Sequence, residues 1–283
     1  MMARLLTGKE VAQQIERDIL HEVRELQTQG ISPALRIMIV GDAAESVAYT
    51  VNATRIAEKL GVSCCIERLP AATSQDEFVK MLNKRNADQT IHGILVMRPL
   101  PKHIQEDIVK YAIAPEKDID CLNPVNAGKV MVGDLTGFPP ATPQAVMKIL
   151  HFYKIPMSGK EAVIIGRSMV VGKPLALLLL RENATVTVCH SRTQDLPAVC
   201  RRADILIAAI GKKTMITPDY IKSGASVIDV GINVVGDTLY GDVDTEQAKE
   251  VAGAITPVPG GVGAVTTRVV LEHVVRAAKM QNS

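Results

Sequence analysis

The sequence has no tryptophan, few other aromatic residues and almost no net charge. Of its 283 residues only 3% are aromatic, and Lys+Arg 32 against Asp+Glu 30 leave a formal net charge of +2. Non-specific nucleic-acid binding needs a broad positive surface, and single-stranded bases stack on aromatic side chains. We therefore expect no nucleic-acid partner.

Long apolar runs and paired cysteine motifs are also missing. The longest apolar run, Leu175–Leu180, is far shorter than the ~20 residues of a membrane helix. The first residues, MMARLLTGKEVAQQ, lack the apolar stretch and small-residue cleavage site of a signal peptide. The five cysteines form no CxxC pair, and His190 has no partner at metal-ligand spacing. These absences predict a cytoplasmic protein with reduced thiols, no membrane association and no metal.

What is present is an alternation of short β-rich runs with longer helical patterns. In the first half, strands are expected at 35–40, 63–69 and 91–97, and helices at 45–60 and 75–85. In the second half, strands are expected at 162–165, 184–189, 205–210 and 226–230, and helices at 173–181 and 268–280. Nearly continuous apolar strands between helices indicate parallel sheets. We predict an α/β protein of two lobes, the second Rossmann-like with a mostly parallel sheet.

The lobe boundary is expected near residue 140. Residues 1–140 form the first lobe, with the helix at 268–280 packing back on it, and residues 141–267 form the dinucleotide-binding domain. The segment 114–140 is rich in proline, glycine and asparagine, so it is expected to consist of loops and short turns.

A glycine loop follows the first strand of the second lobe. The strand leads into Gly166, a short loop contains Gly172, and a helix begins near Pro174. Glycines let backbone N–H groups approach a pyrophosphate, and the helix dipole favours negative charge there. The spacing is not GxGxxG, so dinucleotide binding and a purely structural turn both remain open.

The end of the next strand favours NADP over NAD. An NAD site usually places a carboxylate there, but the sequence has His190–Ser191–Arg192–Thr193. Arg167, Ser168 and Arg192 suit a 2′-phosphate, because guanidinium pairs with phosphate oxygens. Arg192 as a solvated loop residue is the alternative. The glycine-rich loop at 255–266 is expected to pack against a ligand or a neighbouring strand.

Long motifs now make the chain resemble the methylenetetrahydrofolate dehydrogenase/methenyltetrahydrofolate cyclohydrolase family. The two strongest are GRSxxVGKP at 166–174 and TPVPGGVG at 256–263. The supporting matches run nearly end to end, in order: SVAYTVN (46–52), HGILV…RPLP (92–101), PEKDID (115–120), NAGK (126–129), ADI…AAIG (203–211), GASVIDVGIN (224–233) and GDVD (241–244).

The resemblance implies two lobes around a cleft, a homodimer, NADP on the second lobe and tetrahydrofolate in the cleft. It implies hydride transfer from 5,10-methylene-tetrahydrofolate, followed by hydrolysis of the methenyl product. The implied cofactor-binding residues are Gly166, Arg167, Ser168, Val171, Gly172, His190, Ser191, Arg192, Gly211, Gly231, Ile232 and Thr266. The implied substrate-binding residues are Tyr49, Arg98, Pro99, Leu100, Asp120, Pro259 and Gly260, with Tyr49 and Asp120 as the catalytic pair.

The sequence departs from the family pattern on the folate side. The family motif SxxYxxxK keeps its tyrosine as Tyr49, but its lysine position is Ala53. The glutamine that tunes this lysine is Met97, the following leucine is Arg98, and the glycine after Asp120 is Cys121. The next loop has Ala264 and Val265 in place of proline and methionine. Because the cofactor motifs are intact, we predict a dehydrogenase whose cyclohydrolase activity is lost or weak.

Several alternatives stay open. Arg98 could supply the missing charge, giving a bifunctional enzyme, or it could contact solvent or the folate tail. Tyr49 could only pack the cleft, Asp120 could cap a turn, and Cys121 could be a reactive thiol or a small buried residue. The chain could also be a non-catalytic binding paralogue, or act on an altered substrate.

Overall fold

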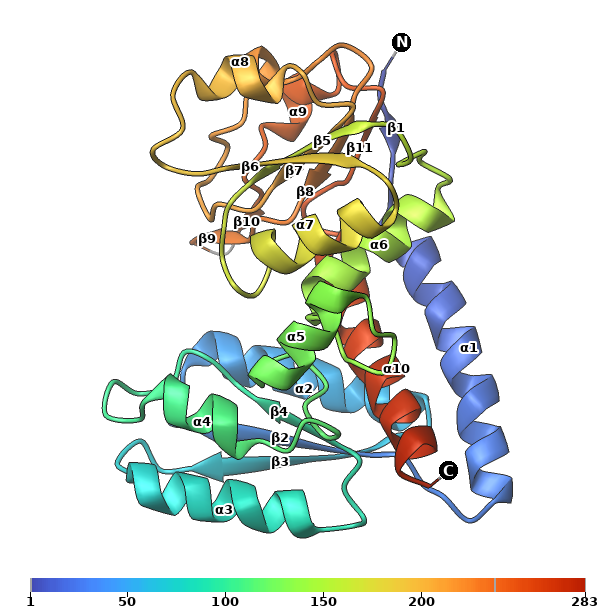
Figure 1. Ribbon diagram of the computed structural model, residues 1–283, viewed down its shortest axis with the longest axis vertical. Coiled ribbons are helices and arrows are strands. Elements are labelled where there is room, and N and C mark those ends of the chain that lie inside the picture. Colours follow the sequence, from blue (N-terminus) through green and yellow to red (C-terminus); the bar gives the residue numbers. More distant parts are fainter. Residues whose placement is uncertain (1, 237, 283) are drawn as a thin grey trace. The chain divides into compact units, whose positions relative to one another are not determined.

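The computed structural model describes residues 2–236 and 238–282, although not the side chains of residues 44–46. Ser46 of the SVAYTVN motif therefore has no described side chain. The chain divides into two compact units, one of residues 1–13 and 140–266 and the other of residues 14–139 and 267–283 (Figure 1). In the described residues, no helix is both long and apolar enough to cross a membrane.

The unit of residues 1–13 and 140–266 is built on a parallel sheet with the strand order β1-β11-β8-β7-β5-β6. Its strands are β1 (Arg4–Leu5), β5 (Glu161–Ile165), β6 (Thr185–Cys189), β7 (Ile205–Ala208), β8 (Ser226–Asp229) and β11 (Ala254–Ile255), with a hairpin of β9 (Asn233–Val235) and β10 (Thr238–Tyr240). Its helices are α6 (Ala141–Phe152), α7 (Gly172–Arg181), α8 (Leu196–Cys200), α9 (Thr245–Ala248) and the 3-10 turn η1 (Pro218–Tyr220).

Burial on both faces explains this sheet. All four residues of β7 are buried, as expected of a central strand in a parallel sheet covered by helices. One structural finding corrects the expected lobe boundary: residues 1–13 belong with this unit rather than with the first lobe. The reason is that β1 pairs in parallel with β11 and joins the edge of this sheet.

The unit of residues 14–139 and 267–283 has a parallel three-stranded sheet with the order β3-β2-β4. Its strands are β2 (Ala34–Val40), β3 (Ser63–Leu69) and β4 (Gly93–Val96), and its helices are α2 (Ala44–Lys59), α3 (Gln75–Ala87), α4 (Glu106–Ala112) and α5 (Pro124–Val132). The helices α1 (Gly8–Thr28) and α10 (Gly263–Gln281) each contribute residues to both units.

Helices cover both faces of this smaller sheet. Phe78 and Leu82 of α3 and Val109 of α4 share one buried cluster with alternate residues of β2 and β4. On α10, Val274 comes so close to Gly93 that a Cβ there would lie 2.9 Å from its Cγ2. Residues 114–140 are not loops and turns throughout, because they contain the helix α5. Asn123 caps its first turn by accepting a hydrogen bond from the Val125 N–H, and Pro124 follows as its first residue.

Candidate active site

The loop after β5 leads into α7 with little room for side chains. A Cβ on Gly166 would lie 2.2 Å from the Ala209 carbonyl oxygen, and one on Gly172 would lie 2.0 Å from the Gly166 carbonyl oxygen. Val171, which precedes α7, makes no side-chain cap. The Lys173 N–H donates to the Ser168 carbonyl at 3.1 Å and Pro174 has no N–H, so within the described residues Gly172 is the position of this first turn whose N–H is left for a ligand. Uncapped N–H groups at a helix N-terminus, next to glycines, suit a phosphate.

This loop lies where the order of strand addition in the parallel sheet reverses from one side of β5 to the other. The chain goes from β5 to β6 on one side and then to β7 on the other side of β5. Backbone hydrogen bonds hold these strand ends together. The Gly166 N–H donates to the Cys189 carbonyl oxygen at 2.9 Å, and the Ala209 N–H donates to the Ile165 carbonyl oxygen at 2.9 Å. In open α/β sheets, ligands bind at the carboxyl ends of the strands where the order reverses.

The loop after β6 forms a closed turn without a free carboxylate. The His190 N–H donates to the Thr193 hydroxyl at 2.9 Å, and the Arg192 N–H donates to His190 Nδ1 at 3.2 Å. Asp195, the next acidic residue, accepts a hydrogen bond from the Ala198 N–H and caps α8. Arg167, Ser191 and Arg192 are exposed near these loops. The edge therefore offers guanidinium and hydroxyl groups to a ligand.

Two buried aspartates hold the remaining cofactor loops. Asp242 accepts hydrogen bonds from three successive N–H groups, those of Ile210, Gly211 and Lys212, at 2.6, 3.0 and 2.8 Å. Asp229, at the end of β8, accepts from the N–H groups of Gly231, Asp242 and Val243 at 2.9–3.0 Å. The pair therefore joins the loop that follows β7 to the loop that follows β8.

The close packing of this pair explains two glycines of the motifs. A Cβ on Gly231 would lie 2.2 Å from the Asp242 carboxyl carbon, and one on Gly241 would lie 1.8 Å from Asp229 Oδ2. Burial, and more weakly the charge of Asp242, raise the pKa of Asp229 to about 6. The loops thus depend on carboxylates that have no access to solvent.

A cavity of about 270 Å³ in the same unit brings together two groups of predicted residues. Gly231 and Ile232, predicted to bind the cofactor, and Pro259 and Gly260, predicted to bind the substrate, all line it. Ile232 is 60% exposed, so its side chain can cover a bound molecule. Thr266 lies on α10, where its hydroxyl donates to the Gly263 carbonyl.

The other predicted substrate residues lie in the unit of the three-stranded sheet. Tyr49 on α2 is half-buried, and its hydroxyl hydrogen-bonds Thr267. Burial and then the charge of Asp120 raise the pKa of Tyr49, so its hydroxyl stays protonated. Arg98, which follows β4, places Nη2 3.8 Å from Asp120 Oδ2, and each side chain is 28% exposed. Tyr49, Arg98 and Asp120 therefore form one cluster, beside the exposed Pro99 and the partly buried Leu100.

Asp118 shapes the loop that carries Asp120. Its buried carboxylate accepts hydrogen bonds from the N–H groups of Leu122 and Asn123, both at 2.8 Å, and from Asn126 Nδ2 at 2.9 Å. Burial raises the pKa of Asp118 to about 6. Cys121 has a φ of 60°, in the left-handed region where glycine is favoured. The loop therefore has a backbone conformation that favours glycine although it carries a thiol at this position.

The Cys121 thiol is half-buried, so it is neither fully buried nor freely exposed. Burial, Asp118 and Asp120 raise the pKa of Cys121 to about 12, which keeps it a neutral thiol rather than a reactive thiolate. Among the described residues, no group of three or more metal-ligating side chains exists.

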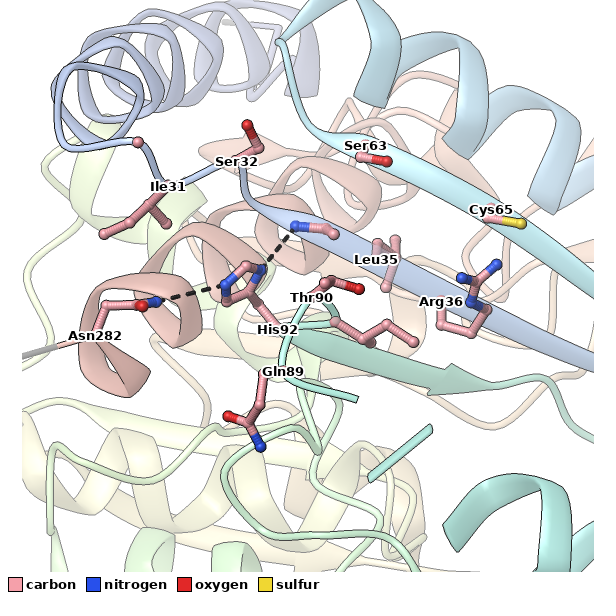
Figure 2. A pocket seen from close by; sticks show the side chains of 13 residues that line it. Ile31, Ser32, Leu35, Arg36, Ser63, Cys65, Gln89, Thr90, His92 and Asn282 are labelled. Carbon is pink, nitrogen blue, oxygen red and sulfur yellow. Dashed lines mark hydrogen bonds between the residues drawn. The ribbon is translucent and has the colours of Figure 1, made fainter. Parts of the chain in front are cut away.

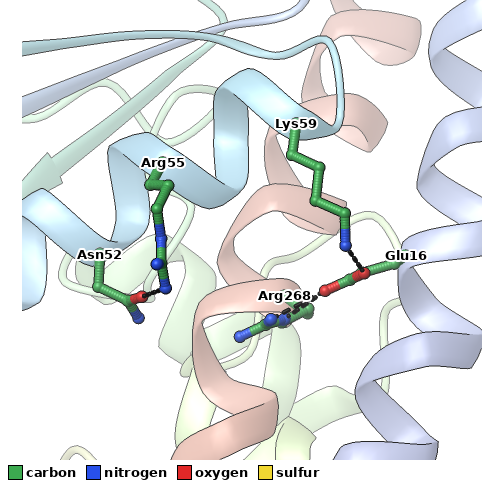
Figure 3. A network of polar contacts seen from close by, with 5 residues as sticks. All are labelled: Glu16, Asn52, Arg55, Lys59 and Arg268. Atoms are coloured by element: carbon green, nitrogen blue, oxygen red, sulfur yellow. Dashed lines mark hydrogen bonds and ion pairs between the residues drawn. The ribbon is translucent and has the colours of Figure 1, made fainter.

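No lysine occupies the position one turn after Tyr49. Ala53 there is 1% exposed, and the cations further along α2 are bound elsewhere. Figure 3 shows that Lys59 donates to Glu16 at 2.8 Å, while Arg55 donates to Asn52 at 3.2 Å. Arg268 of α10 donates to the other Glu16 oxygen at 2.8 Å. Neither Arg55 nor Lys59 therefore stands in for the missing lysine.

Sequence reasoning missed the residues that support the site. Thr267, the partner of Tyr49, directly follows Thr266 but has no motif signal of its own. Asp242 lies within the GDVD motif, where a conspicuous aspartate could have been assigned a role. Asp118 lies in PEKDID, two residues before Asp120.

Comparisons with known proteins match both parts of the chain. Residues 6–120 match the family model for the tetrahydrofolate dehydrogenase/cyclohydrolase catalytic domain. Residues 140–282 match the model for the NAD(P)-binding domain of the same family. The chain belongs to the tetrahydrofolate dehydrogenase/cyclohydrolase family. The predicted family, the α/β fold with its Rossmann-like domain and the nicotinamide dinucleotide class of cofactor are thereby confirmed.

Similar proteins from this family cover the chain end to end. "Bifunctional protein FolD" of Alkaliphilus oremlandii is 52% identical over 100% of this chain and 99% of its own length. The crystal structure of the bifunctional enzyme FolD of Campylobacter jejuni superposes with a TM-score of 0.96 at 39% identity, covering 98% of this chain and 99% of that chain. The Trypanosoma brucei structure, complexed with NADP cofactor and inhibitor, has a TM-score of 0.95 at 35% identity and covers 99% of this chain and 98% of that chain.

Proposed function

We propose that this protein is an NADP-dependent 5,10-methylene-tetrahydrofolate dehydrogenase with weak or absent cyclohydrolase activity. The observation that carries the proposal is Ala53, buried one turn after Tyr49 where the family pattern has lysine. Met97 likewise replaces the glutamine that would tune that lysine. Hydride transfer needs orientation and electrostatics, whereas hydrolysis of the methenyl product needs water activation and proton transfer. The two absent side chains, lysine and glutamine, would serve the hydrolysis and not the hydride transfer.

NADP is the dinucleotide that the strand ends fit better. No carboxylate stands free after β6 to bind ribose hydroxyls, since Asp195 caps α8. Arg167 and Arg192 are exposed and would pair with a 2′-phosphate. The Gly172 N–H at the start of α7 would donate to the pyrophosphate. When bound, NADP would accept the hydride.

On the folate side, the chain's own groups would bind and orient the substrate. Asp120 would accept hydrogen bonds from the pterin, and Tyr49, held by Thr267 and protonated, would donate one. Arg98 would lie beside Asp120 at the rim. Pro259 and Gly260 would contact the substrate from the glycine-rich loop. We further propose a cytoplasmic homodimer, and light scattering of the purified protein would give its mass.

The decisive experiment follows NADPH and methenyl-tetrahydrofolate in one cuvette after methylene-tetrahydrofolate and NADP are added to pure protein. A buffer blank corrects for spontaneous hydrolysis of the methenyl compound. We expect NADPH to rise and the methenyl compound to accumulate with no decay beyond the blank. Enzymatic hydrolysis at a rate comparable with NADPH formation would overturn the proposal. NADP binding without any turnover would favour a non-catalytic paralogue, and NADP binding without folate binding would favour a different substrate.

A second candidate is a bifunctional enzyme in which Arg98 replaces the lysine. The 3.8 Å approach of Arg98 to Asp120 favours it, because a charge is present in the same cluster. A guanidinium, with a pKa above ~12, is a poor proton shuttle but can stabilise charge. Under this alternative, Arg98→Ala abolishes hydrolysis and spares hydride transfer. An unchanged hydrolytic rate in Arg98→Ala would exclude it.

A further inference from the structure

A pocket of about 440 Å³ lies at the amino end of the three-stranded sheet. It is lined by residues that precede or begin β2, β3 and β4, together with the end of α10 (Figure 2). Of the residues assigned to folate, Arg98, Pro99 and Leu100 directly follow β4 and therefore lie at the opposite, carboxyl edge of the same sheet. Its volume is in the range of small-molecule sites.

The pocket lining carries positive charge and no carboxylate. Arg36 and His92 line it, and the other polar lining groups are the side chains of Ser32, Ser63, Cys65, Gln89, Thr90 and Asn282. Figure 2 shows the Arg36 guanidinium on the side of Cys65, with His92 and Asn282 toward the other end. Nearby acidic groups are already engaged: Thr90 donates to Asp88 at 2.6 Å, and Arg85 binds Glu67 with two hydrogen bonds of 2.7 Å.

The Arg36 guanidinium makes no hydrogen bond and no short ion pair within the described part of the chain, although its charge helps to lower the pKa of Glu67. Its Nε is buried without any hydrogen bond, and none of its nitrogens makes an ion pair with a described residue. Arg36 lies on β2 in register with Cys65 of β3 and Ile94 of β4, so its position is fixed by the sheet. Only the Nε of this half-buried side chain is fully enclosed, so the terminal Nη groups are the donors that a ligand in the pocket can reach. A bound anion would give these donors charged partners.

We propose that this pocket is an accessory site for a small organic molecule bearing a carboxylate or a phosphate group. Arg36 binds the oxyanion through its two terminal Nη groups, which can pair with two oxygens. The hydroxyls of Ser32 and Ser63 and the amide of Gln89 serve the polar remainder of the ligand. His92 contributes no acceptor through Nδ1, which already accepts a hydrogen bond from the Ala34 N–H at 3.2 Å.

The test observes the orphaned atom directly. Protein labelled with ¹⁵N-arginine is titrated with sodium phosphate or sodium acetate against sodium chloride at equal ionic strength. The Nε–Hε signal of Arg36 is the one that Arg36→Gln removes. We expect a saturable shift of that signal with at least one oxyanion. Saturation by phosphate alone assigns a phosphate ester, and saturation by acetate alone assigns a carboxylate.

Matched variants separate this site from other anion sites. Arg68→Gln removes an exposed arginine of β3 and should leave the Arg36 titration unchanged. Arg36→Lys keeps the charge but loses the two-nitrogen geometry, so phosphate or acetate protection against thermal unfolding should weaken about tenfold or more in concentration. Arg36→Gln should leave dehydrogenase turnover unchanged, which keeps this test separate from that of the proposed function. No shift beyond chloride, or a shift that never saturates, would overturn the proposal.

Discussion

The loops of the NAD(P)-binding domain and the proposed folate cluster differ in which part of the chain forms them: the first depends on the backbone, the second on side chains. After β5, β7 and β8, glycines fix the course of the loops, and after β7 and β8 the buried carboxylates of Asp242 and Asp229 hold backbone N–H groups as well. In the proposed folate cluster, the ends of the Tyr49, Arg98 and Asp120 side chains would contact the substrate. A change in the first region alters the path of the chain, whereas a change in the second alters only what a fixed backbone carries.

This difference explains why departures from the family pattern gather on one side. Ala53 lies within helix α2 and Met97 directly follows strand β4, and both elements are regular at these positions although the predicted reactive and tuning groups are absent. The equivalent change on the cofactor side would put a Cβ 2.0 Å from a carbonyl oxygen at Gly172. Catalytic chemistry can therefore be lost here while the fold and the dinucleotide site persist.

The largest expected effect comes from restoring the lysine and glutamine of the family pattern at positions 53 and 97. We expect Ala53→Lys with Met97→Gln to raise methenyl-tetrahydrofolate hydrolysis about 10²-fold or more, since positioned proton transfer contributes that much. Dehydrogenase turnover should change only a few-fold. The measurement is the decay of methenyl-tetrahydrofolate above the buffer blank. Ala53→Met with Met97→Gln is the matched control, because it adds length without charge and should gain nothing; an equal gain in both would contradict the explanation.

The backbone character of the cofactor side is tested at Asp242. Asp242→Asn replaces an acceptor of three N–H groups by an amide with one acceptor oxygen. We expect the KM for NADP to rise about 10- to 100-fold, with a smaller change in kcat, because the loop at Gly211 loses its fixed course. Asp244→Asn, which alters only the cap of α9, is the control. A fall in thermal stability with an unchanged KM for NADP would reduce Asp242 to a purely structural role.

The choice of dinucleotide sharpens the comparison within the cofactor side. Replacing Arg192 by Gln removes a guanidinium without altering the glycine loop. The ratio of kcat/KM for NADP over NAD should fall about tenfold, because only NADP carries the 2′-phosphate. Arg181→Gln, at the end of α7, should leave the ratio unchanged. If Arg192→Gln also leaves it unchanged, Arg192 is a solvated loop residue.

The smallest expected effect concerns pH and stability. The pKa of Asp229 is raised from 3.8 to about 6, so between these values the folded state binds a proton that the unfolded state has released. This group therefore stabilises the protein progressively as pH falls from about 7 toward 4, and the contribution is lost as pH rises through 6. Between pH 7 and pH 5 it amounts to about 1 kcal/mol.

Urea unfolding at both pH values measures this contribution. Asp229→Asn lacks the titrating group, so its free energy of unfolding, relative to the wild type, should drop by a further ~1 kcal/mol at pH 5. Glu246→Gln, at an exposed site, provides the baseline. A difference between variant and wild type that is the same at both pH values would show that Asp229 does not titrate in this range.

Much of the fold could be predicted because burial on both faces leaves an unambiguous pattern. Strands such as β5 and β7 are continuous apolar runs bounded by glycine or polar turns. The edge strand β1, by contrast, is only Arg4–Leu5, and its partner β11 lies some 250 residues away in the chain, so nothing local announces it. The helix α5 was hidden for another reason: its glycine and asparagine look like loop residues, although Asn126 is buried and donates to Asp118.

Candidate site residues could be predicted where a polar or ionisable side chain lies within a family motif, as at Tyr49 and Asp120. What could not be predicted is support that depends on tertiary contact. Asp242 reaches the loop after β7 from 30 residues further along the chain, and the donor groups it satisfies are backbone atoms that no side-chain pattern reveals. The absence of a hydrogen bond to Arg36 Nε also cannot be read from a sequence, because it depends on which neighbouring acceptors are already engaged.

The left-handed backbone at Cys121 has a consequence for how this protein could have diverged. Its loop is held by Asp118 and Asn126, whose bonds do not involve the side chain at position 121. A residue other than glycine is tolerated there at a cost of about 1–2 kcal/mol, while the path of the chain stays the same. The side chain next to Asp120 can therefore change in a single substitution without rebuilding the loop that carries Asp120.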